Sequence, residues 1–398
     1  MRPVEIKKGI YWVGAVDWDI RTFHGNTYST KRGTTYNSYL IIDDKVTLVD
    51  GVLASFAGEQ IERIREIVPV EKIDYIIVNH IEPDHSGALP GLMKLCPKAK
   101  LFGTAKSKEG LSRMYGTDWG LQVVKTGDKL NIGKRNLTFI EAPMIHWPDS
   151  MFTYCAEEEL LLPNDAFGQH YATSERFDDG TDQCALMDEA GKYYANILWP
   201  LGGMIARKID EILKMNISIK MIAPSHGIIW RRDPMKIINS YISWTKNETK
   251  PKAVVIFETM WGSTEMMART ITEGLTDGGV EVKLFDITRS DRTEVNNQML
   301  DARCFVFGSS THDNGMLSTL AGFLEFLNGL KPKGRIGAAF GSCGWAGGAV
   351  PAIEQVLKEA GIELALPSIS VKYVPDQDEL KKCYEMGVEL AKKITGKA

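Results

Sequence analysis

The sequence lacks the paired cysteines that build disulfide frameworks and cysteine-rich metal sites. Its six cysteines stand singly among 398 residues, and the spacing Cys-x-x-Cys does not occur. A thiolate zinc site and a cysteine-ligated iron centre therefore have no support in the sequence. Free thiols in a reducing compartment are the simplest interpretation, and we expect a cytoplasmic protein.

A strong charge imbalance and long apolar segments are also missing. The formal net charge of −4 gives no reason to expect a nucleic acid or an anionic membrane as a partner. No stretch approaches the roughly 18 consecutive apolar residues that a membrane-spanning helix needs. The hydrophobic content of 44% and the charged content of 25% are those of an ordinary globular protein.

At 398 residues the chain is too long for one ordinary domain. The polar stretch TKNETKPK, residues 245–252, has no apolar periodicity and is the best candidate for a linker. Six of the seven histidines precede it, which indicates two parts with different chemistry. We therefore predict one domain over residues 1–248 and a second over residues 249–398.

Both predicted domains belong to the α/β class. In the first, short strands are expected at 39–44, 46–50, 75–80, 100–104 and 137–143, with helices at 56–68 and roughly 186–216. In the second, five buried strands at 253–258, 280–286, 304–309, 335–342 and 368–374 alternate with amphipathic helices. The first pattern indicates sheets covered by helices, and the second indicates a doubly wound parallel sheet.

Polar residues of metal-binding types follow four apolar runs in the first domain. The stretch NHIEPDHSG, residues 79–87, places two histidines and two carboxylates directly after YIIV, and three later runs end in a histidine or an aspartate. Side chains at the carboxyl ends of strands meet at one edge of an α/β sheet. The seven candidate metal ligands are His80, Glu82, Asp84, His85, His146, Asp165 and His226.

This spacing resembles that of the metallo-β-lactamase superfamily, in which His-x-His-x-Asp-His precedes a histidine, an aspartate and a final histidine. Here Glu82 stands in place of the second histidine. Imidazole-rich sites suit zinc, whereas a carboxylate in place of an imidazole adds charge and favours iron. Four histidines and three carboxylates can hold two metals, and Asp165 is the candidate bridge.

The second domain opens with a loop suited to a monophosphate. A buried strand leads into the loop and a helix follows, so hydroxyls, backbone N–H groups and a helix N-terminus come together. Neither GK[ST] nor GxGxxG occurs, which disfavours a triphosphate or a dinucleotide. The loop is similar to the flavodoxin phosphate loop T-x-x-G-x-T and predicts FMN. It consists of Thr259, Met260, Trp261, Gly262, Ser263 and Thr264.

Two later strand ends are expected to line the flavin ring. Small and polar residues can contact the ring edge, and glycines let the backbone approach a flat ring. Either Trp345 or Trp261 could stack on it. The first loop comprises Ser309, Ser310, Thr311, His312, Asp313, Asn314 and Gly315, and the second Ser342, Cys343, Gly344, Trp345, Ala346, Gly347 and Gly348.

Taken together, these features resemble the flavodiiron proteins (A-type flavoproteins) over essentially the whole chain. The stretches that carry the resemblance are RGTTYNSYLI, NHIEPDHSG, APMIHWPDSMFTY, LPNDAFGQH, APSHGIIW and TMWGST. The resemblance implies a metallo-β-lactamase-like αββα domain followed by a flavodoxin-like domain, without a fused rubredoxin. It also implies an oxidoreductase that reduces O2 to water, NO to N2O, or both, with electrons passing through FMN to two non-haem irons.

The resemblance implies roles for individual residues as well. One iron takes His80, Glu82 and His146, the other takes Asp84, His85 and His226, and Asp165 bridges them. His85 is the ligand that the family pattern allows to give way to water. His24 and Tyr193 resemble residues that line the pocket above the irons. Asp50 is a candidate partner for a ligand imidazole, and a cap in a turn is an equal interpretation.

Partners follow from the same resemblance. The electron donor is expected to be rubredoxin or reduced coenzyme F420, and we favour rubredoxin. A head-to-tail homodimer, in which the FMN of one chain faces the irons of the other, is expected, with pairing into a tetramer as an extension. The alternatives are a zinc-dependent metallo-hydrolase with a fused flavodoxin domain, which Glu82 disfavours, and an electron carrier without a functional metal.

Overall fold

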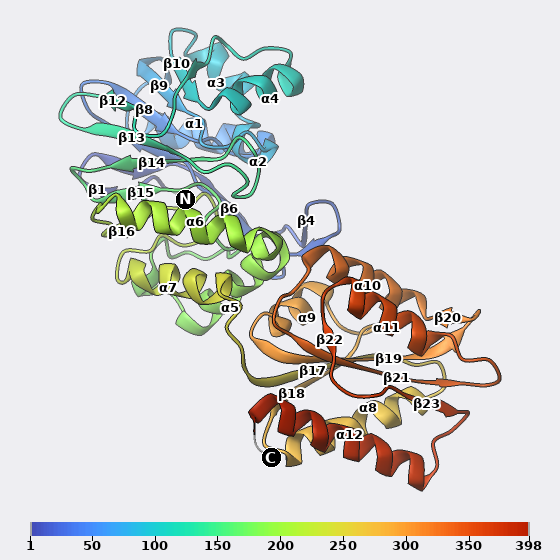
Figure 1. Ribbon diagram of the computed structural model, residues 1–398. Coiled ribbons are helices and arrows are strands. Elements are labelled where there is room, and N and C mark those ends of the chain that lie inside the picture. Colours follow the sequence, from blue (N-terminus) through green and yellow to red (C-terminus); the bar gives the residue numbers. More distant parts are fainter. Residues whose placement is uncertain (1, 397–398) are drawn as a thin grey trace. The chain divides into compact units, whose positions relative to one another are not determined.

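The computed structural model describes residues 2–396, which form two compact units (Figure 1). The first unit runs to Tyr193 and resumes over Leu201–Ile242, and the second contains Tyr194–Pro200 and the chain from Ser243 onward. Residues 1, 397 and 398, at the outer ends of the predicted domains, lie outside the described residues. The predicted division after residue 248 stays a prediction.

Two sheets form the centre of the first unit. One has the order β1 (Val4–Lys7), β2 (Ile10–Trp12), β7 (Tyr39–Ile41), β8 (Val46–Val49), β9 (Ile73–Ile77), β10 (Lys100–Gly103) and β11 (Gln122–Val123). The other has the order β12 (Lys129–Asn131), β13 (Asn136–Glu141), β14 (Met151–Cys155), β15 (Leu160–Leu162) and β16 (Met221–Ile222). Both sheets contribute buried side chains to one core, which includes Trp12, Tyr39, Phe139 and Leu160.

Helices cover both sheets on their outer sides, which gives the predicted αββα layers. Buried residues of α1 (Ala57–Arg65), α3 (Leu89–Leu95) and α4 (Ala105–Tyr115) share a second core with the first sheet. Figure 1 shows α6 (Gly202–Lys214) and α7 (Pro234–Thr245) on the opposite side, next to the second sheet. The first unit also contains two small antiparallel sheets of two strands each. One pairs β3 (Ala15–Asp17) with β6 (Thr34–Tyr36), and the other pairs β4 (Thr22–Phe23) with β5 (Tyr28–Ser29).

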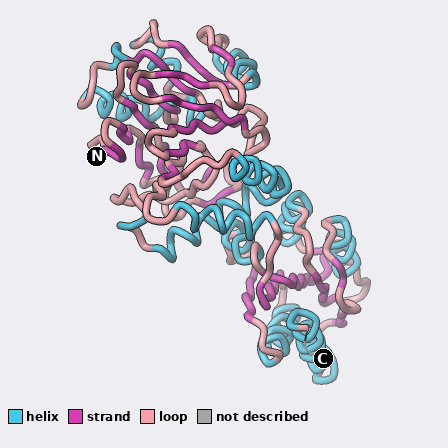
Figure 2. The backbone as a smooth tube through the Cα atoms, turned by 60° about the vertical axis from the view of Figure 1, so that its left-hand side comes forward, coloured by secondary structure: helices cyan, strands magenta, loops and turns pink. Residues whose placement is uncertain are grey.

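The second unit is the predicted doubly wound sheet. Its parallel order is β18 (Glu281–Asp286), β17 (Lys250–Glu258), β19 (Ala302–His312), β21 (Ile336–Cys343) and an edge made of β22 (Glu363–Leu364) and β23 (Ile369–Lys372). Helices α8 (Ser263–Asp277) and α12 (Gln377–Thr395) lie on one face, and α9 (Arg292–Met299), α10 (Ser318–Leu330) and α11 (Ala349–Glu359) lie on the other (Figure 1). Figure 2 shows these strands between the two helical layers. A short strand, β20 (Gly315–Met316), turns back antiparallel on β19.

Three expected elements differ from the structure. The helix expected over 186–216 is divided into α5 (Gln183–Tyr193), a π-helical turn (Tyr194–Leu198), a 3-10 turn (Trp199–Leu201) and α6. Pro200 falls at this break and has no N–H to continue a helical ladder. The edge strand expected at 368–374 corresponds to β23. It pairs with the same strand, β21, as the preceding short strand β22, so the edge of the sheet is interrupted between them.

The predicted linker is the third difference. Helix α7 continues to Thr245 and β17 already begins at Lys250, so only residues 246–249 connect them. Lys252 is buried, and its Nζ lies 2.9 Å from an Asp301 carboxylate oxygen and 2.9 Å from Gln298 Oε1. A lysine-rich segment resembles a loop in sequence, but a long side chain with a carboxylate partner is compatible with a strand.

Helices α8 and α12 touch backbone to backbone at two glycines. A Cβ on Gly387 would lie 2.3 Å from the Ile271 carbonyl oxygen, and one on Gly274 would lie 2.2 Å from that of Tyr384. Gly322 in α10 is exposed, and a Cβ there would meet nothing within 4 Å. Close packing, rather than helix propensity, therefore accounts for glycine at 387.

This contrast predicts opposite signs for two Gly-to-Ala changes. Gly322→Ala should raise the free energy of unfolding by up to about 1 kcal/mol, because alanine is the better helix former. Gly387→Ala should lower it by roughly 1–3 kcal/mol, because the helices must move apart. Urea denaturation of both variants, followed by circular dichroism, measures the difference. Stabilisation by both would contradict the packing argument.

Candidate metal centre and flavin site

Loops at the ends of strands β9, β13, β15 and β16 bring the seven predicted metal ligands together. His80 follows β9, and Glu82 stands before the short helix α2 (Pro83–Ser86), which contains Asp84 and His85. Pro83 occupies the first position of this helix, where its fixed φ is favourable and its missing N–H costs nothing. The remaining three ligands follow the other strands: His146 after β13, Asp165 after β15 and His226 after β16.

The ligands form two groups. In the first, the ligand atoms of His80, Glu82, His146 and Asp165 all lie within 4.8 Å of one another. In the second, Asp84, His85 and His226 satisfy the same condition. Glu82 Oε2 lies 3.3 Å from the Nε2 atoms of both His80 and His146. Asp84 Oδ2 lies 3.3 Å from His85 Nε2 and 3.1 Å from His226 Nε2.

The Asp165 carboxylate lies between these groups. Its Oδ2 is 3.3 Å from His146 Nε2 and 3.6 Å from His80 Nε2. Its Oδ1 is 3.1 Å from His85 Nε2 and 3.4 Å from His226 Nε2. Each oxygen therefore faces a different histidine pair, which is the arrangement expected of a carboxylate shared by two cations.

The chemistry of this cluster fits a metal pair. Asp84, His85 and Asp165 are buried, and neither oxygen of Asp84 accepts a hydrogen bond from any residue in the described range 2–396. Its Oδ2 instead faces the imidazoles of His85 and His226, so the buried charge is balanced only by protons on those rings or by a cation among these atoms. Two histidines with one carboxylate are the donor set typical of non-haem Fe(II) sites.

Electrostatics make the imidazoles and carboxylates strong mutual partners. Burial lowers the pKa of His80 and His146, but hydrogen bonds to neighbouring carboxylates outweigh it and raise both to about 10. The pKa of His85 rises to about 9, because the charges of Asp84 and Asp165 outweigh burial. Burial raises the pKa of Glu82 and Asp165, yet the same histidines hold both well below their usual range.

Side chains behind the ligands fix the imidazole rings. His80 Nδ1 lies 3.0 Å from Asp149 Oδ2, and His226 Nδ1 lies 2.6 Å from the backbone carbonyl of Thr35, to which it can donate. Ser225 Oγ donates to Asp165 Oδ1 at 3.1 Å. The sequence prediction did not include these partners, although Asp149 stands only three residues after His146.

Within residues 2–396 Asp50 accepts no hydrogen bond from an imidazole, although the charge of the predicted ligand His85 acts on it. Its carboxylate accepts hydrogen bonds from the backbone N–H of Asn79 at 2.8 Å and from the side-chain amides of Asn79 and Asn164. It sits at a positive φ of 57° directly after β8. Asp50 therefore holds the loop before His80 against the loop before Asp165, which is a structural role.

The two residues predicted to line the pocket above the irons lie at different ligands: His24 lies beside Glu82 and Tyr193 beside His226. His24 belongs to the β4–β5 hairpin, and its Nε2 lies 3.1 Å from Glu82 Oε1. Tyr193 ends α5, is buried, and its ring centroid lies 6.3 Å from that of His226. Burial, and then the nearby Asp165 carboxylate, raise the pKa of Tyr193 well above its usual value, so the phenol stays protonated. His170, absent from the prediction, packs between the Tyr193 and His226 rings.

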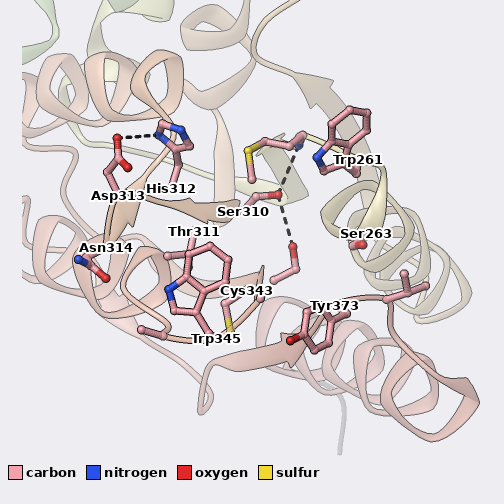
Figure 3. A pocket seen from close by; sticks show the side chains of 15 residues that line it. Trp261, Ser263, Ser310, Thr311, His312, Asp313, Asn314, Cys343, Trp345 and Tyr373 are labelled. Atoms are coloured by element: carbon pink, nitrogen blue, oxygen red, sulfur yellow. Dashed lines mark hydrogen bonds and ion pairs between the residues drawn. The ribbon is translucent and has the colours of Figure 1, made fainter.

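The second unit carries a cavity of about 660 Å³ at the carboxyl ends of its strands (Figure 3). Thirteen of the predicted flavin-binding residues line it: Met260, Trp261, Ser263, Ser310, Thr311, His312, Asp313, Asn314, Ser342, Cys343, Gly344, Trp345 and Ala346. Among the described residues no lysine or arginine does so, which agrees with a phosphate held by hydroxyls and N–H groups.

The other predicted flavin residues shape the loops behind the cavity. Thr264 is buried, and its Oγ1 lies 3.0 Å from the hydroxyls of Ser310 and Ser342, which tie the three loops together. A Cβ on Gly348 would overlap the Asn314 carbonyl oxygen at 1.8 Å, so glycine there allows two loops to touch. The remaining predicted residues outside the lining are Thr259, Gly262, Ser309, Gly315 and Gly347.

Large aromatic side chains at the cavity stand in solvent. Trp261 is 92% exposed and Trp345 is 84% exposed, which is unusual for residues of their size. Both line the cavity, as Figure 3 shows, so a planar ring bound there would cover them. Tyr373 and Val374 also line it and were not predicted. They follow β23, and the rule that ligands bind beyond the carboxyl ends of strands could have found them.

Fold and site together define an oxidoreductase type that joins a two-metal centre with a flavin domain, and comparison with known proteins agrees. Residues 34–227 match the family described as ODP family beta lactamase, and residues 255–387 match Flavodoxin. The nitric oxide reductase of Moorella thermoacetica is 53% identical over 395 residues, which cover 99% of each chain.

Two solved structures extend the comparison. The rubredoxin oxygen:oxidoreductase of Desulfovibrio gigas superposes with a TM-score of 0.97 at 36% identity and covers 99% of each chain. The flavodiiron protein of Giardia intestinalis has a TM-score of 0.95 at 37% identity and covers 100% of this chain and 97% of its own. This chain belongs to the flavodiiron protein family.

Family membership confirms the predicted enzyme class and cofactors. The chain is an oxidoreductase, its cofactors are FMN and a non-haem iron pair, and the metallo-hydrolase alternative is not favoured. None of the helices within residues 2–396 has the length and apolar character needed to cross a membrane.

Metal loading should release protons. With pKa values of about 10, 9 and 10, His80, His85 and His146 are protonated at pH 7 before a metal binds, and imidazole must be neutral to ligate. Apparent metal affinity should therefore rise with pH up to that range. Calorimetric titration of metal-free protein with Mn(II) at pH 7, in two buffers of different ionisation enthalpy, should show more than one proton released per chain. Release of none would contradict the assignment.

Proposed function

We propose that this chain is a flavodiiron reductase whose main activity is the reduction of NO to N2O, with O2 as a second substrate. The observation that carries the proposal is the Asp165 carboxylate, which faces one histidine pair with each oxygen. The preference for NO is supported by the 53% identity to a nitric oxide reductase. Two NO molecules, two electrons and two protons give N2O and water.

In this proposal the seven ligands divide as the geometric groups do. His80, Glu82 and His146 would hold one iron and Asp84, His85 and His226 the other, and Asp165 would offer one oxygen to each. When bound, the iron pair supplies open coordination positions and electrons to a diatomic ligand, while FMN stores one or two electrons. The chain itself keeps the buried carboxylates ionised and presents imidazole Nε2 atoms to the metals.

Residues around the metal pocket shape access and hydrogen bonding. His24 is partly exposed and its Nε2 lies 3.1 Å from Glu82 Oε1, so we propose that it lines the route by which a diatomic ligand reaches the metals. Tyr193 is kept protonated by burial, so its hydroxyl can donate a hydrogen bond but is a poor acid. Trp147 is half-buried and packs edge-to-face on His80 with ring centroids 5.1 Å apart, which shields one side of that imidazole.

The flavin loops supply the second half of the proposal. Hydroxyls and N–H groups of residues 259–264 hold the FMN phosphate, and Trp261 or Trp345 covers the ring. We propose rubredoxin as the donor, which the name of the Desulfovibrio gigas relative supports, with reduced coenzyme F420 as the alternative. We also propose a head-to-tail homodimer, in which the partner would cover whichever of Trp261 and Trp345 the flavin ring leaves exposed.

Stopped-flow kinetics test the function directly. The protein is loaded with iron, reduced anaerobically at FMN and iron, and mixed separately with NO and with O2. We expect fast flavin reoxidation by NO with release of N2O, and slower reoxidation by O2. Metal-free protein with intact FMN is the control and should not react with NO. Failure of iron-loaded protein to reoxidise with either gas would overturn the proposal.

Replacement of the bridge should separate the metal centre from the flavin. Asp165→Asn removes the charge shared by both histidine pairs, so iron affinity and NO turnover should fall by more than the roughly 10–100-fold that loss of a ligand's hydrogen-bond partner costs, and iron content should fall with them. FMN content should not change. Asp178→Asn is the matched control, because Asp178 is buried and accepts from the backbone N–H groups of Arg231 and Arg232. Normal iron content in Asp165→Asn would contradict the bridging role.

A further inference from the structure

The two metal positions have the same donor set. Each receives two histidine Nε2 atoms, one carboxylate of its own and one oxygen of Asp165. Glu82 is the private carboxylate of the first position and Asp84 that of the second. Donor type therefore gives no reason for a metal ion to prefer either position, and any preference must come from what lies behind the ligands.

The support behind the ligands is unequal. At the first position, both oxygens of Asp149 lie within hydrogen-bond reach of His80 Nδ1, at 3.0 and 3.1 Å. At the second, the partner of His226 Nδ1 within the described part of the chain is the neutral carbonyl of Thr35. His85 Nδ1, also at the second position, is buried and has no hydrogen-bond partner within residues 2–396. In hydrogen bonds to the ring Nδ1 atoms, the first position thus has a carboxylate and the second a neutral carbonyl, while the Asp50 carboxylate acts on His85 through its charge alone.

Asp149 is itself held in place. It is buried, its Oδ2 accepts from the backbone N–H of Ile81 at 2.9 Å, and its carbonyl oxygen accepts from Thr104 Oγ1 at 3.0 Å. Thr104 also caps helix α4, so the aspartate is anchored to regular structure rather than to a free loop. A carboxylate that accepts the other ring N–H of a ligand histidine fixes its tautomer and orientation and increases its basicity.

From this asymmetry we propose that Asp149 is a positioning residue that makes the His80–Glu82–His146 position bind metal more tightly. The two positions therefore fill in a fixed order, and the Asp84–His85–His226 position fills last and empties first. This inference rests on the proposed function only in that both positions hold metal. Its test measures metal binding without turnover, so it can fail while NO reduction stands.

Manganese titration tests the order of filling. Metal-free full-length protein with FMN oxidised is titrated with Mn(II) and followed by electron paramagnetic resonance. The first equivalent should give an isolated Mn(II) signal, and the second should convert it to a spin-coupled pair. His226→Ala should keep the tight first step, whereas His80→Ala should lose it. A coupled signal from the first equivalent, or equal effects of the two variants, would overturn the order.

Substitution of Asp149 tests the cause. Asp149→Asn should weaken the tight step by roughly 10–100-fold and leave the weak step unchanged. Asp149→Glu keeps the charge and should bind between wild type and Asp149→Asn, while Asp178→Asn serves as the buried-aspartate control. FMN content and circular dichroism check folding. If Asp149→Asn does not fold, Asp149→Glu decides the role. A substituted protein that binds both equivalents as wild type does, or loses both steps equally, would refute it.

Discussion

Four loops of the first unit meet at the buried carboxylate of Asp165. Carboxylates and imidazoles at this density repel or attract one another strongly once water is excluded, so the loops are compatible only when cations or protons balance the charge. In the absence of metal, protons on the histidines balance the carboxylates, which is why the pKa values of His80 and His146 are raised and those of Glu82 and Asp165 are lowered. The two sheets beneath provide the rigid ends from which these side chains project.

The second unit uses loops at strand ends to bind a different kind of ligand. It also places its site beyond the carboxyl ends of parallel strands, but the ligand there is a large organic ring with a phosphate. The loops therefore present hydroxyls, backbone N–H groups and exposed indoles rather than a dense cluster of charge. Family membership places both chemistries in one enzyme.

Strong local patterns made much of this predictable. The buried strands of both units end where apolar runs end, and polar residues directly after them, such as His80 and Asp165, come together as the topology requires. Details that depend on tertiary contacts were not predictable. Lys252 can lie in a strand because its ammonium donates a hydrogen bond to the carboxylate of Asp301, which is far away in the sequence. Asp50 binds asparagines rather than an imidazole, and Asp149 supports His80 although no spacing rule marks it. Glycine is required at position 348 because a Cβ there would overlap the backbone of a second loop at Asn314.

The most direct test of the central claim is a crystal structure of iron-loaded protein with anomalous diffraction at the iron edge. We predict two iron peaks per chain on opposite sides of the Asp165 carboxylate, one beside His80, Glu82 and His146 and the other beside Asp84, His85 and His226. A single peak, or a zinc signal with no iron, would contradict the account and return attention to Glu82 as a feature of a different metal chemistry.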